Sequence, residues 1–373
     1  MVNSPTDTPA AAAEPVPATV PAPTEAVQIE ADDAVSSLIS ITPSESSLTI
    51  WADRRSLDRR ANVRKSPERN TPQELVVECR YSSSYSTSLA SSAVDYPTEH
   101  GRRYHAFRRG AYILPNDEME MDRLDLTHAM VCKAIGDKLY LAPLEKEKVH
   151  RILDVGTGTG IWAMEIADEF PNAEVLGNDL SAIQPTWVPT NVKFEIDDVE
   201  SPWVNSKKYD YIFVRHMAGS IADWPKLVKN IFDNLNPGGW AEFHDLDGEY
   251  YSQDGSFTES HTTNYWNQKC IEACRMIGRE PCPGRKIEGW VRDAGFRNVT
   301  HEQFKCPVGP WPKDPHFQEI GMMNLIQLLE GLEGFSLKLF CEVLGKTREE
   351  VLVMLAKVRL EMKTRAFHAM FDQ

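Results

Sequence analysis

A short run of small residues with an acidic neighbour is the part of this 373-residue sequence with the clearest chemistry. Residues 156–160 read Gly-Thr-Gly-Thr-Gly, directly after the apolar run 149–155 and before the helical pattern at 160–169. Glycines between a strand and a helix let a ligand approach bare main chain, while the helix N-terminus offers free N–H groups. The spacing therefore predicts a ligand-binding loop at 156–160.

The loop differs from the dinucleotide-binding fingerprint. That fingerprint is G-x-G-x-x-G, whose last glycine allows close packing of helix and strand beside a pyrophosphate. Here Gly160 comes one residue earlier, and Asp154 stands near the end of the preceding strand. A carboxylate is poorly placed for a pyrophosphate but suits a ligand that carries an ammonium or sulfonium group. A dehydrogenase is therefore only an outside alternative.

The loop needs a sheet to hold it, and the surrounding sequence alternates between strand and helix. Strands are predicted at 149–155, 173–179, 192–198, 209–216 and 240–246. Helical patterns occur at 114–142, 160–169, 223–239, 262–279, 284–295, 316–333 and 336–369, with a sixth strand at 296–309. Alternating strands and helices indicate a parallel sheet covered on both sides. We expect an α/β fold with a doubly wound, mostly parallel sheet, in which Asn-Pro-Gly-Gly ends the helix at 223–239.

The N-terminal quarter has a different composition. Residues 1–30 are mostly Ala, Pro, Thr and Glu, and serine-rich patches continue to 93. Such segments bury too little apolar surface to offset their chain entropy, so 1–95 is predicted to be disordered. The basic stretch 53–69 could be a nuclear address or an anion-binding patch, but a solvated linker is favoured.

Charge and cysteine usage exclude several classes of protein. A net charge of −15 and a pI near 5.2 argue against direct binding of nucleic acid, which needs a positive surface. The seven cysteines form no CxxC pair and no ligand cluster, so we expect reduced thiols and no metal site. No secretory signal or membrane-spanning apolar run is evident. These features predict an intracellular protein, cytoplasmic or nuclear or both.

Three acidic positions in the expected order strengthen the interpretation of the loop. Asp154, Asp179 and Asp198 each stand at the end of a predicted strand. Residues 151–198 thereby resemble class I S-adenosylmethionine-dependent methyltransferases. The resemblance implies that Asp179 accepts hydrogen bonds from the ribose hydroxyls and that Asp198 with Val199 meets the adenine, Asp197 being the alternative. The cofactor-binding set it implies is Asp154, Gly156, Thr157, Gly158, Gly160, Asp179, Leu180, Asp198, Val199, Arg215, Tyr104 and Tyr112.

A closer resemblance covers roughly 100–370. The segments "ILDVGTGTGIWA", "YDYIFVRHMAGSIADWPKL" and "LNPGGWAEFHDLD" are similar to those of fungal LaeA-like methyltransferases. That group implies methyl transfer to a small molecule of secondary metabolism or to a regulatory protein. The alternative is a regulatory scaffold that binds S-adenosylmethionine without turnover, with velvet-type proteins as possible partners in either case.

The same resemblance implies a domain layout. Residues 96–148 are expected to form a helical lid, and 149–373 a methyltransferase domain whose C-terminal helices cover the substrate side. Related chains finish with an antiparallel strand after the last helix, whereas this sequence stops at "RAFHAMFDQ". We expect either an unpaired sheet edge or a shortened chain at that point.

Two histidines are candidates for a base or a substrate contact, because ligands in open α/β sheets sit at the carboxyl ends of the strands. His216 follows the fourth strand and is the first candidate; His244 follows the fifth and is the second. A structural histidine is the alternative for both. Tyr104 and Tyr112, with His105, precede the first strand, where their rings could enclose a sulfonium. Trp203 and Trp224 are expected to line or roof the pocket, with core packing equally open.

Overall fold

The structure is a computed structural model that describes residues 81–83, 93–108, 110–204 and 207–373. The basic stretch 53–69 and most of the segment 1–95, predicted to be disordered, lie outside the described residues. None of the described helices is long and apolar enough to cross a membrane.

The central element is a five-stranded sheet. It consists of β4 (Arg151–Val155), β5 (Glu174–Asp179), β7 (Val192–Ile196), β8 (Tyr209–Arg215) and β9 (Leu235–His244), in the order β7-β5-β4-β8-β9. All four neighbouring pairs run parallel. The predicted α/β fold with a doubly wound parallel sheet is thereby confirmed.

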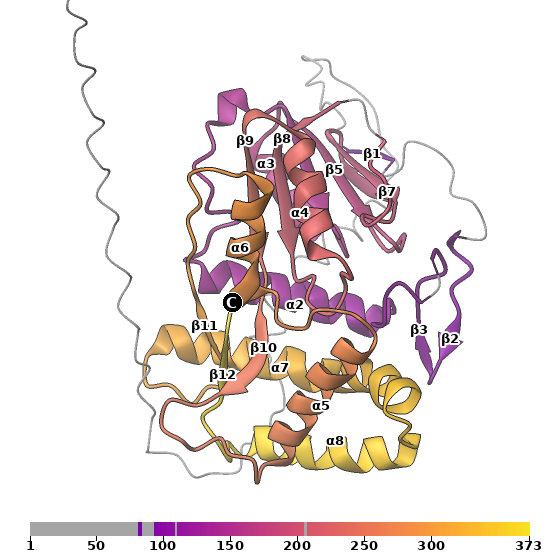
Figure 1. Ribbon diagram of the computed structural model, residues 1–373, viewed down its shortest axis with the longest axis vertical. Helices are drawn as coiled ribbons and strands as arrows, with labels where there is room; N and C mark the ends of the chain where they lie inside the picture. Colours follow the sequence, from indigo (N-terminus) through magenta and orange to yellow (C-terminus); the bar gives the residue numbers. More distant parts are fainter. Residues whose placement is uncertain (1–80, 84–92, 109, 205–206) are drawn as a thin grey trace, which may run out of the picture.

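Alternate residues of the strands build two separate cores. Ile152 of β4 packs with Trp162 and Ile166 of α3 (Ile161–Glu169), whereas its neighbour Leu153 belongs to the opposite face. There Leu227 and other apolar residues of α4 (Trp224–Asp233) pack together with α6 (Gly284–Ala294). Since side chains of a strand point alternately to the two faces, continuous apolar strands such as β4 require cover on both sides. Figure 1 shows α4 and α6 on the near face of the sheet.

The helix predicted at 223–239 is too long. It ends at Asp233, with Asn234 as its C-cap, and Leu235 already belongs to β9. The apolar residue Leu235 fits the helical pattern and the strand pattern equally, so periodicity could not place the boundary. The pairing of Leu235 with Tyr209 of β8 places the boundary before Leu235. A shift in the register of the two strands then accommodates the Pro-Gly-Gly of residues 237–239.

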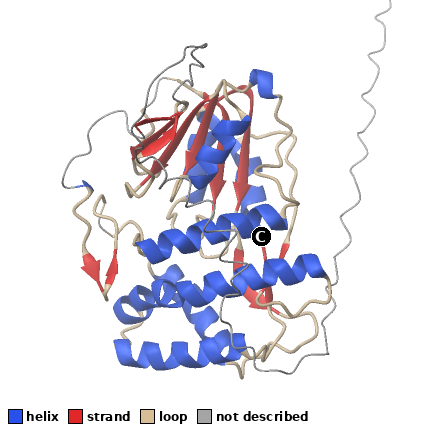
Figure 2. Ribbon diagram, turned by 180° about the vertical axis from the view of Figure 1, so that it is seen from behind, coloured by secondary structure: helices blue, strands red, loops and turns tan. Residues whose placement is uncertain are grey.

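A helical layer covers the carboxyl ends of the strands. Its members are α2 (Glu118–Ala134), α5 (Thr262–Met276), α7 (Pro315–Lys338), the π-helical turn η3 (Leu339–Val343) and α8 (Arg348–Lys363). In Figures 1 and 2 α2 lies nearest the sheet and α8 farthest from it. The helix predicted at 336–369 is divided, because a turn follows η3 and Thr347 then begins α8 through a capping box with Glu350.

A second, three-stranded sheet continues from β9. Its strands are β10 (Asp247–Tyr251), β12 (Met370–Asp372) and β11 (Lys305–Pro307), with β12 in the middle and antiparallel to both neighbours. An antiparallel strand after the last helix is therefore present as β12, but it pairs with β10 and β11, and β9 remains an edge strand of the five-stranded sheet, as one of the two expectations had it. The strand predicted at 296–309 shrinks to β11, because only its last part finds a partner strand.

The remaining short elements lie at the periphery. They are β1 (Tyr81–Ser83), which pairs with β6 (Trp187–Pro189), the hairpin of β2 (Thr98–Glu99) and β3 (Arg102–Arg103), and the turn η2 (Lys146–Lys148). The hairpin leads into the segment that enters α2, so it connects to the part of the molecule that covers the glycine loop.

Candidate functional site

The glycine loop adopts backbone conformations that favour glycine. Gly156, Gly158 and Gly160 have φ angles of 67°, 58° and 79°. A Cβ on Gly156 would lie 2.6 Å from the Sδ of Met217, and one on Gly160 would lie 2.4 Å from the ring of Phe194. Gly160 is thus required by packing against the sheet, while Gly158 has only Leu124 nearby and leaves its main chain the most approachable.

Asp154 lies beneath this loop. Its carboxylate is buried and accepts a 2.5 Å hydrogen bond from the Oγ1 of Thr157. Burial raises the pKa of Asp154 to about 7, and the hydrogen bond from Thr157 and the charge of Arg215 lower it only in part. A cationic ligand group beside this carboxylate would favour its ionised form, so the site is suited to an ammonium or sulfonium.

Asp179 faces the loop from the end of β5. One carboxylate oxygen accepts the N–H of Gly158 at 2.9 Å, and the other accepts the N–H of Ser181 at 2.9 Å. Burial raises the pKa of Asp179 to about 6, against the opposing effect of these backbone donors. The next residue, Leu180, is half-buried beside the same loop. Asp179 and the glycine loop are therefore in direct contact.

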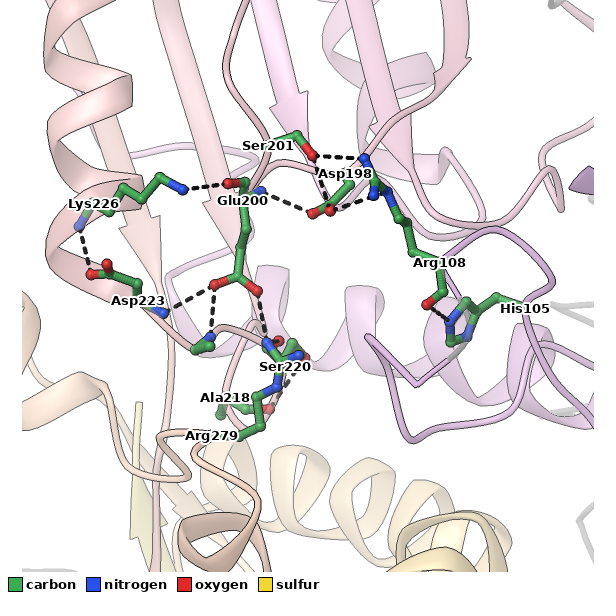
Figure 3. Close-up of polar contacts among 11 residues, drawn as sticks. His105, Arg108, Asp198, Glu200, Ser201, Ala218, Ser220, Asp223, Lys226 and Arg279 are labelled. Atoms are coloured by element: carbon green, nitrogen blue, oxygen red, sulfur yellow. Dashed lines mark hydrogen bonds and ion pairs between the residues drawn. The ribbon is translucent and has the colours of Figure 1, made fainter.

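Asp198 follows β7 and is held by its own turn (Figure 3). Its two oxygens accept hydrogen bonds from the N–H of Glu200, at 3.0 Å, and the Oγ of Ser201, at 3.1 Å. Arg108 reaches over from the N-terminal segment, with its Nε 3.7 Å from Asp198 and its Nη2 3.3 Å from Ser201. Val199 is buried next to this turn. Arg108 therefore closes the end of the site where the resemblance places an adenine.

Glu200 ties the same turn to two other parts of the molecule (Figure 3). Its carboxylate accepts the N–H groups of Ala222 and Asp223 at the start of α4, at 2.9 and 3.0 Å. It also accepts Nη1 of Arg279 at 2.7 Å, and the same nitrogen donates to the carbonyl of Ser220 at 2.7 Å. The loop after β8 is thereby joined to the C-terminal helices.

The helix α2 and the segment before it cover the glycine loop. Asp125 of α2 accepts a 2.7 Å hydrogen bond from the Oγ1 of Thr159, and Leu124 faces Gly158. Asn116 donates to the Oγ of Ser181 at 3.1 Å. Sequence reasoning predicted a lid in this region but missed these residues, since no local pattern distinguishes them and their partners lie 34 to 65 positions away.

Arg215 ends β8 close to Asp154. Its Nη2 lies 2.8 Å from the Nδ1 of His128 in α2, and the Nε2 of that histidine lies 3.0 Å from Glu165 of α3. Burial lowers the pKa of Arg215, and within the described residues no carboxylate lies within ion-pair distance of its guanidinium. Arg215 is half-buried, and a partly desolvated cation without a paired carboxylate favours an anionic ligand group.

His216 and His244 lie side by side at the ends of β8 and β9. The N–H of His216 donates to the carbonyl of His244 at 2.9 Å, and His216 has a φ of 55°. Burial, reinforced by the charges of Arg215 and Arg123, lowers the pKa of His216 to about 3. The Nε2 of His244 is 2.6 Å from Glu242, so that ring is held within the sheet. The Nε2 of His216 is buried and makes no hydrogen bond of good geometry among the described residues, while the nearby side chain of Gln373 opposes part of the fall in its pKa.

The aromatic candidates are separated by the fold. Tyr104 is buried beneath the ammonium of Lys338 in α7, 3.7 Å from the ring centroid, and no described contact joins it to the glycine loop. Tyr112 is close enough to Asp179 for that charge to help raise its pKa, although burial is the larger cause. Trp224 is buried and stacks on Trp290, while Trp203 is half-buried and donates to the carbonyl of Val199. Of the two tyrosines, Tyr112 is the one placed near the loop.

A parallel α/β sheet with a glycine loop between acidic strand ends is the arrangement expected of class I S-adenosylmethionine-dependent methyltransferases. Residues 126–301 match the family model described as "Methyltransferase domain". The chain is 46% identical to "Methyltransferase pytC" of Aspergillus terreus over 287 residues, covering 77% of this chain and 88% of that protein. It is 36% identical to "Secondary metabolism regulator laeA" of Monascus pilosus, covering 77% and 79% respectively.

The chain therefore belongs to the methyltransferase family that includes pytC and the LaeA-like regulators. A further relative is "Protein-methionine methyltransferase laeA" of Emericella nidulans, 35% identical and covering 73% of each chain. Among solved structures, a phosphoethanolamine N-methyltransferase 2 of Haemonchus contortus aligns with 67% of this chain and 51% of its own, at 19% identity and a TM-score of 0.37. The protein is an S-adenosylmethionine-dependent methyltransferase.

Proposed function

We propose that the methyl donor is held by the glycine loop and three carboxylates, and that its methyl group passes to an acceptor beside His216. The observation that carries this proposal is the bare main chain of Gly156 and Gly158 between Asp154 and Asp179. Around Gly158 only the side chain of Leu124 lies nearby, so the loop suits a ligand that contacts main chain there. When bound, S-adenosylmethionine supplies an electrophilic methyl group on a sulfonium.

Each end of the donor has a chemically matched residue. Asp154 and Arg215 lie close enough to influence each other's charge, and they would take the ammonium and the carboxylate of an amino-acid end. Asp179 would accept the ribose hydroxyls, and the turn of Asp198 and Val199 would flank the adenine. Arg108 would cover that ring, because its guanidinium already lies over Asp198. Positioning and exclusion of water are the contributions of these residues to the reaction.

His216 is the first candidate for contact with the acceptor. At a pKa of about 3 its ring is neutral at physiological pH, and its buried Nε2 makes no hydrogen bond of good geometry among the described residues, with the side chain of Gln373 nearby. Such a ring can orient an acceptor by a hydrogen bond but holds a proton poorly. This favours acceptors with an available lone pair or an acidic hydroxyl. His244 is the second candidate, with its Nε2 already occupied by Glu242.

A small molecule of secondary metabolism is the first acceptor class that we propose. The second is the thioether of a protein methionine, for which the position of Met217 is the specific observation. Its sulfur lies 2.6 Å from the position that a Cβ of Gly156 would take, next to the proposed donor site. A thioether needs no base, because its sulfur lone pair forms the new S–C bond as the donor's bond breaks, and no proton leaves. One relative is named for this activity.

The acceptor class is tested with methyl-labelled S-adenosylmethionine. The purified protein is incubated with the donor alone and with a fungal extract, and label is measured in the protein and metabolite fractions. Label on the protein that disappears in Met217→Leu but persists in the exposed control Met276→Leu supports the methionine acceptor. Label confined to an extract metabolite supports the small-molecule acceptor. Absence of label in both fractions would leave the regulatory scaffold, with velvet-type proteins as the partners to test by co-purification.

A further inference from the structure

His128 of α2 is a buried histidine between charged residues of two other elements. Its side chain is only 5% exposed. On one side its Nδ1 lies 2.8 Å from the Nη2 of Arg215, which ends β8. On the other side its Nε2 lies 3.0 Å from the Oε2 of Glu165 in α3. The proposed function gives Arg215 a role at the donor and leaves His128 without one.

The two neighbours fix the tautomer of this ring. A guanidinium has only N–H donors, so the Nδ1 of His128 accepts from Arg215 and carries no proton. The ring proton is then on Nε2, which donates it to Glu165. Burial is the largest cause that lowers the pKa of His128, and the charge of Arg215 lowers it further. The carboxylates of Glu165 and Asp125 oppose this fall. The ring is therefore neutral at physiological pH.

A neutral acceptor orients Arg215 without cancelling its charge. The guanidinium also lies over the ring of Phe213, with its Cζ 5.6 Å from the centroid, so it is held at a face and at an edge. Burial lowers the pKa of Arg215, whereas the carboxylates of Asp154 and Glu165 act to raise it and thus lie nearby. An ion pair with either carboxylate would neutralise the guanidinium. His128 stands between Arg215 and Glu165, so the positive charge stays available for an anionic ligand group.

The face of α2 that carries His128 is the face toward the donor site. Asp125, three positions earlier, accepts a 2.7 Å hydrogen bond from Thr159 in the glycine loop. Residues three apart lie on the same side of a helix, so Asp125 and His128 share this face. Asp154 and Arg215 influence each other's charge at the same edge of the sheet. The contact of His128 with Arg215 therefore lies beside the place proposed for the amino-acid end of the donor.

We propose that His128 is a positioning residue for the methyl donor. It holds Arg215 toward the carboxylate of the donor's amino-acid end and preserves the full charge of the guanidinium. This inference rests on the proposed role of Arg215 and extends it, since His128 acts through Arg215 without contacting the donor. Substitution of His128 therefore changes the recognition of one ligand group, the carboxylate. A residue that only packed α2 onto the sheet would affect all ligands of the site alike.

The test compares two ligands that differ only in this carboxylate. S-Adenosylhomocysteine keeps the complete amino-acid end, and decarboxylated S-adenosylhomocysteine keeps the ammonium alone. Calorimetry on the full chain measures both dissociation constants, and their ratio reports the contribution of the carboxylate. In the unchanged protein we expect a preference of about tenfold or more for S-adenosylhomocysteine, because a carboxylate on a guanidinium makes strong hydrogen bonds. Equal affinities would refute the role proposed for Arg215, and the inference with it.

Two substitutions separate the two nitrogens of the ring. His128→Asn places an amide oxygen where Nδ1 accepts, whereas His128→Gln places its amide where Nε2 donates and leaves Arg215 without an acceptor. We expect the preference for the carboxylate to fall about tenfold in His128→Gln and less than about threefold in His128→Asn. Methylthioadenosine, which lacks the amino-acid end, should bind both variants as it binds the unchanged protein. A full preference in His128→Gln, or an equal loss in both variants, would overturn the inference while leaving the role of Arg215 intact.

A further measurement needs no altered donor site. Nitrogen NMR of the histidine-labelled protein reports which ring nitrogens carry a proton, and the His128 signals are those missing from the spectrum of His128→Asn. At neutral pH we expect a neutral ring with its proton on Nε2. A charged ring, or a proton on Nδ1, would contradict the proposal, because neither form accepts a hydrogen bond from Arg215.

Discussion

At the scale of single residues, the site consists of acidic groups kept partly protonated by burial. Asp154 and Asp179 have pKa values raised to about 7 and about 6. Both values lie above those of an unfolded chain, so the folded state binds these protons more tightly. When the pH rises above the pKa values of the unfolded chain, ionising these two buried carboxyls lowers the free energy of unfolding. When the pH is below the pKa values of the unfolded chain, both groups are protonated in either state and this destabilisation is absent. A cationic ligand changes that balance, because it stabilises the ionised carboxylates.

Cofactor binding should therefore release protons. Near pH 6.5 we expect S-adenosylmethionine to displace a fraction of a proton from Asp154, and its affinity to rise with pH through about 7. Calorimetry in buffers of different ionisation enthalpy measures this release. Asp154→Asn should abolish most of it and weaken binding. Asp245→Asn is the matched control, since burial also raises the pKa of Asp245 to about 7 but its oxygens bind main-chain N–H groups after β8 and β9. Equal loss in both variants would contradict the role of Asp154.

A substitution in the glycine loop separates strain from ligand contact. In Gly156→Ala the new Cβ would displace Met217, and a φ of 67° is strained for alanine. We expect at least tenfold weaker binding of S-adenosylmethionine. Gly136→Ala carries similar strain, with a φ of 80° and open space around it, and should cost only about 1 kcal/mol of unfolding free energy. Unchanged affinity in Gly156→Ala would reject the loop assignment.

At the scale of elements, α2 covers the glycine loop. It contacts α3 and β8 through His128, and the glycine loop through Asp125. Arg215 donates to the Nδ1 of His128, so the Nε2 of that ring carries the proton shared with Glu165. The contacts of α2 with the glycine loop, α3 and β8 are polar and few, while the contacts of α2 with α7 are numerous. The cover is therefore more firmly attached to the helical layer than to the loop it closes.

Removing one hydroxyl should loosen that closure. Thr159→Val keeps the shape of the side chain but eliminates its 2.7 Å hydrogen bond to Asp125. A lost hydrogen bond to a charged group corresponds to about 1.5 kcal/mol, and we expect cofactor affinity to fall roughly tenfold. Hydrogen exchange should rise in the first turns of α2. The exposed Thr300→Val serves as the control, and identical exchange in both variants would show that α2 does not depend on this contact.

At the scale of the whole molecule, two layers meet around the site, and Arg279 joins them. This residue follows α5, and its Nη1 reaches Glu200 after β7 and the carbonyl of Ser220 after β8. Both ion-pair partners are largely buried, at 14% and 23% exposure of their side chains. Loss of one partner leaves the other charge poorly solvated, which costs more than the net value of the pair.

Arg279→Met should therefore destabilise the protein by about 2 kcal/mol, measured by urea unfolding. Glu200→Gln should cost a similar amount, and the double variant less than the sum, because each single change removes the same interaction. The surface pair Arg292 and Glu288 provides the control, since exposed pairs at helical spacing contribute little. Fully additive costs would show that Arg279 and Glu200 act independently.

The sequence by itself predicted the sheet and the acidic strand ends, because those features are local. The succession of five strands along the chain, the loop at 156–160 and the places of Asp154, Asp179 and Asp198 at strand ends follow from apolar runs that end in polar residues. The boundary between α4 and β9 was predicted wrongly, because Leu235 is apolar in either element and only its pairing partner decides between them.

Only the tertiary structure decided which distant residues complete the site. Arg108, Asp125 and His128 reach the strand ends from the N-terminal side, and no pattern around them indicates it. Burial likewise sets the protonation of Asp154 and His216, since a pKa depends on solvent and charges that the fold brings together. Periodicity reports how a segment folds locally, whereas contacts between distant segments and their removal from water exist only once the chain has folded.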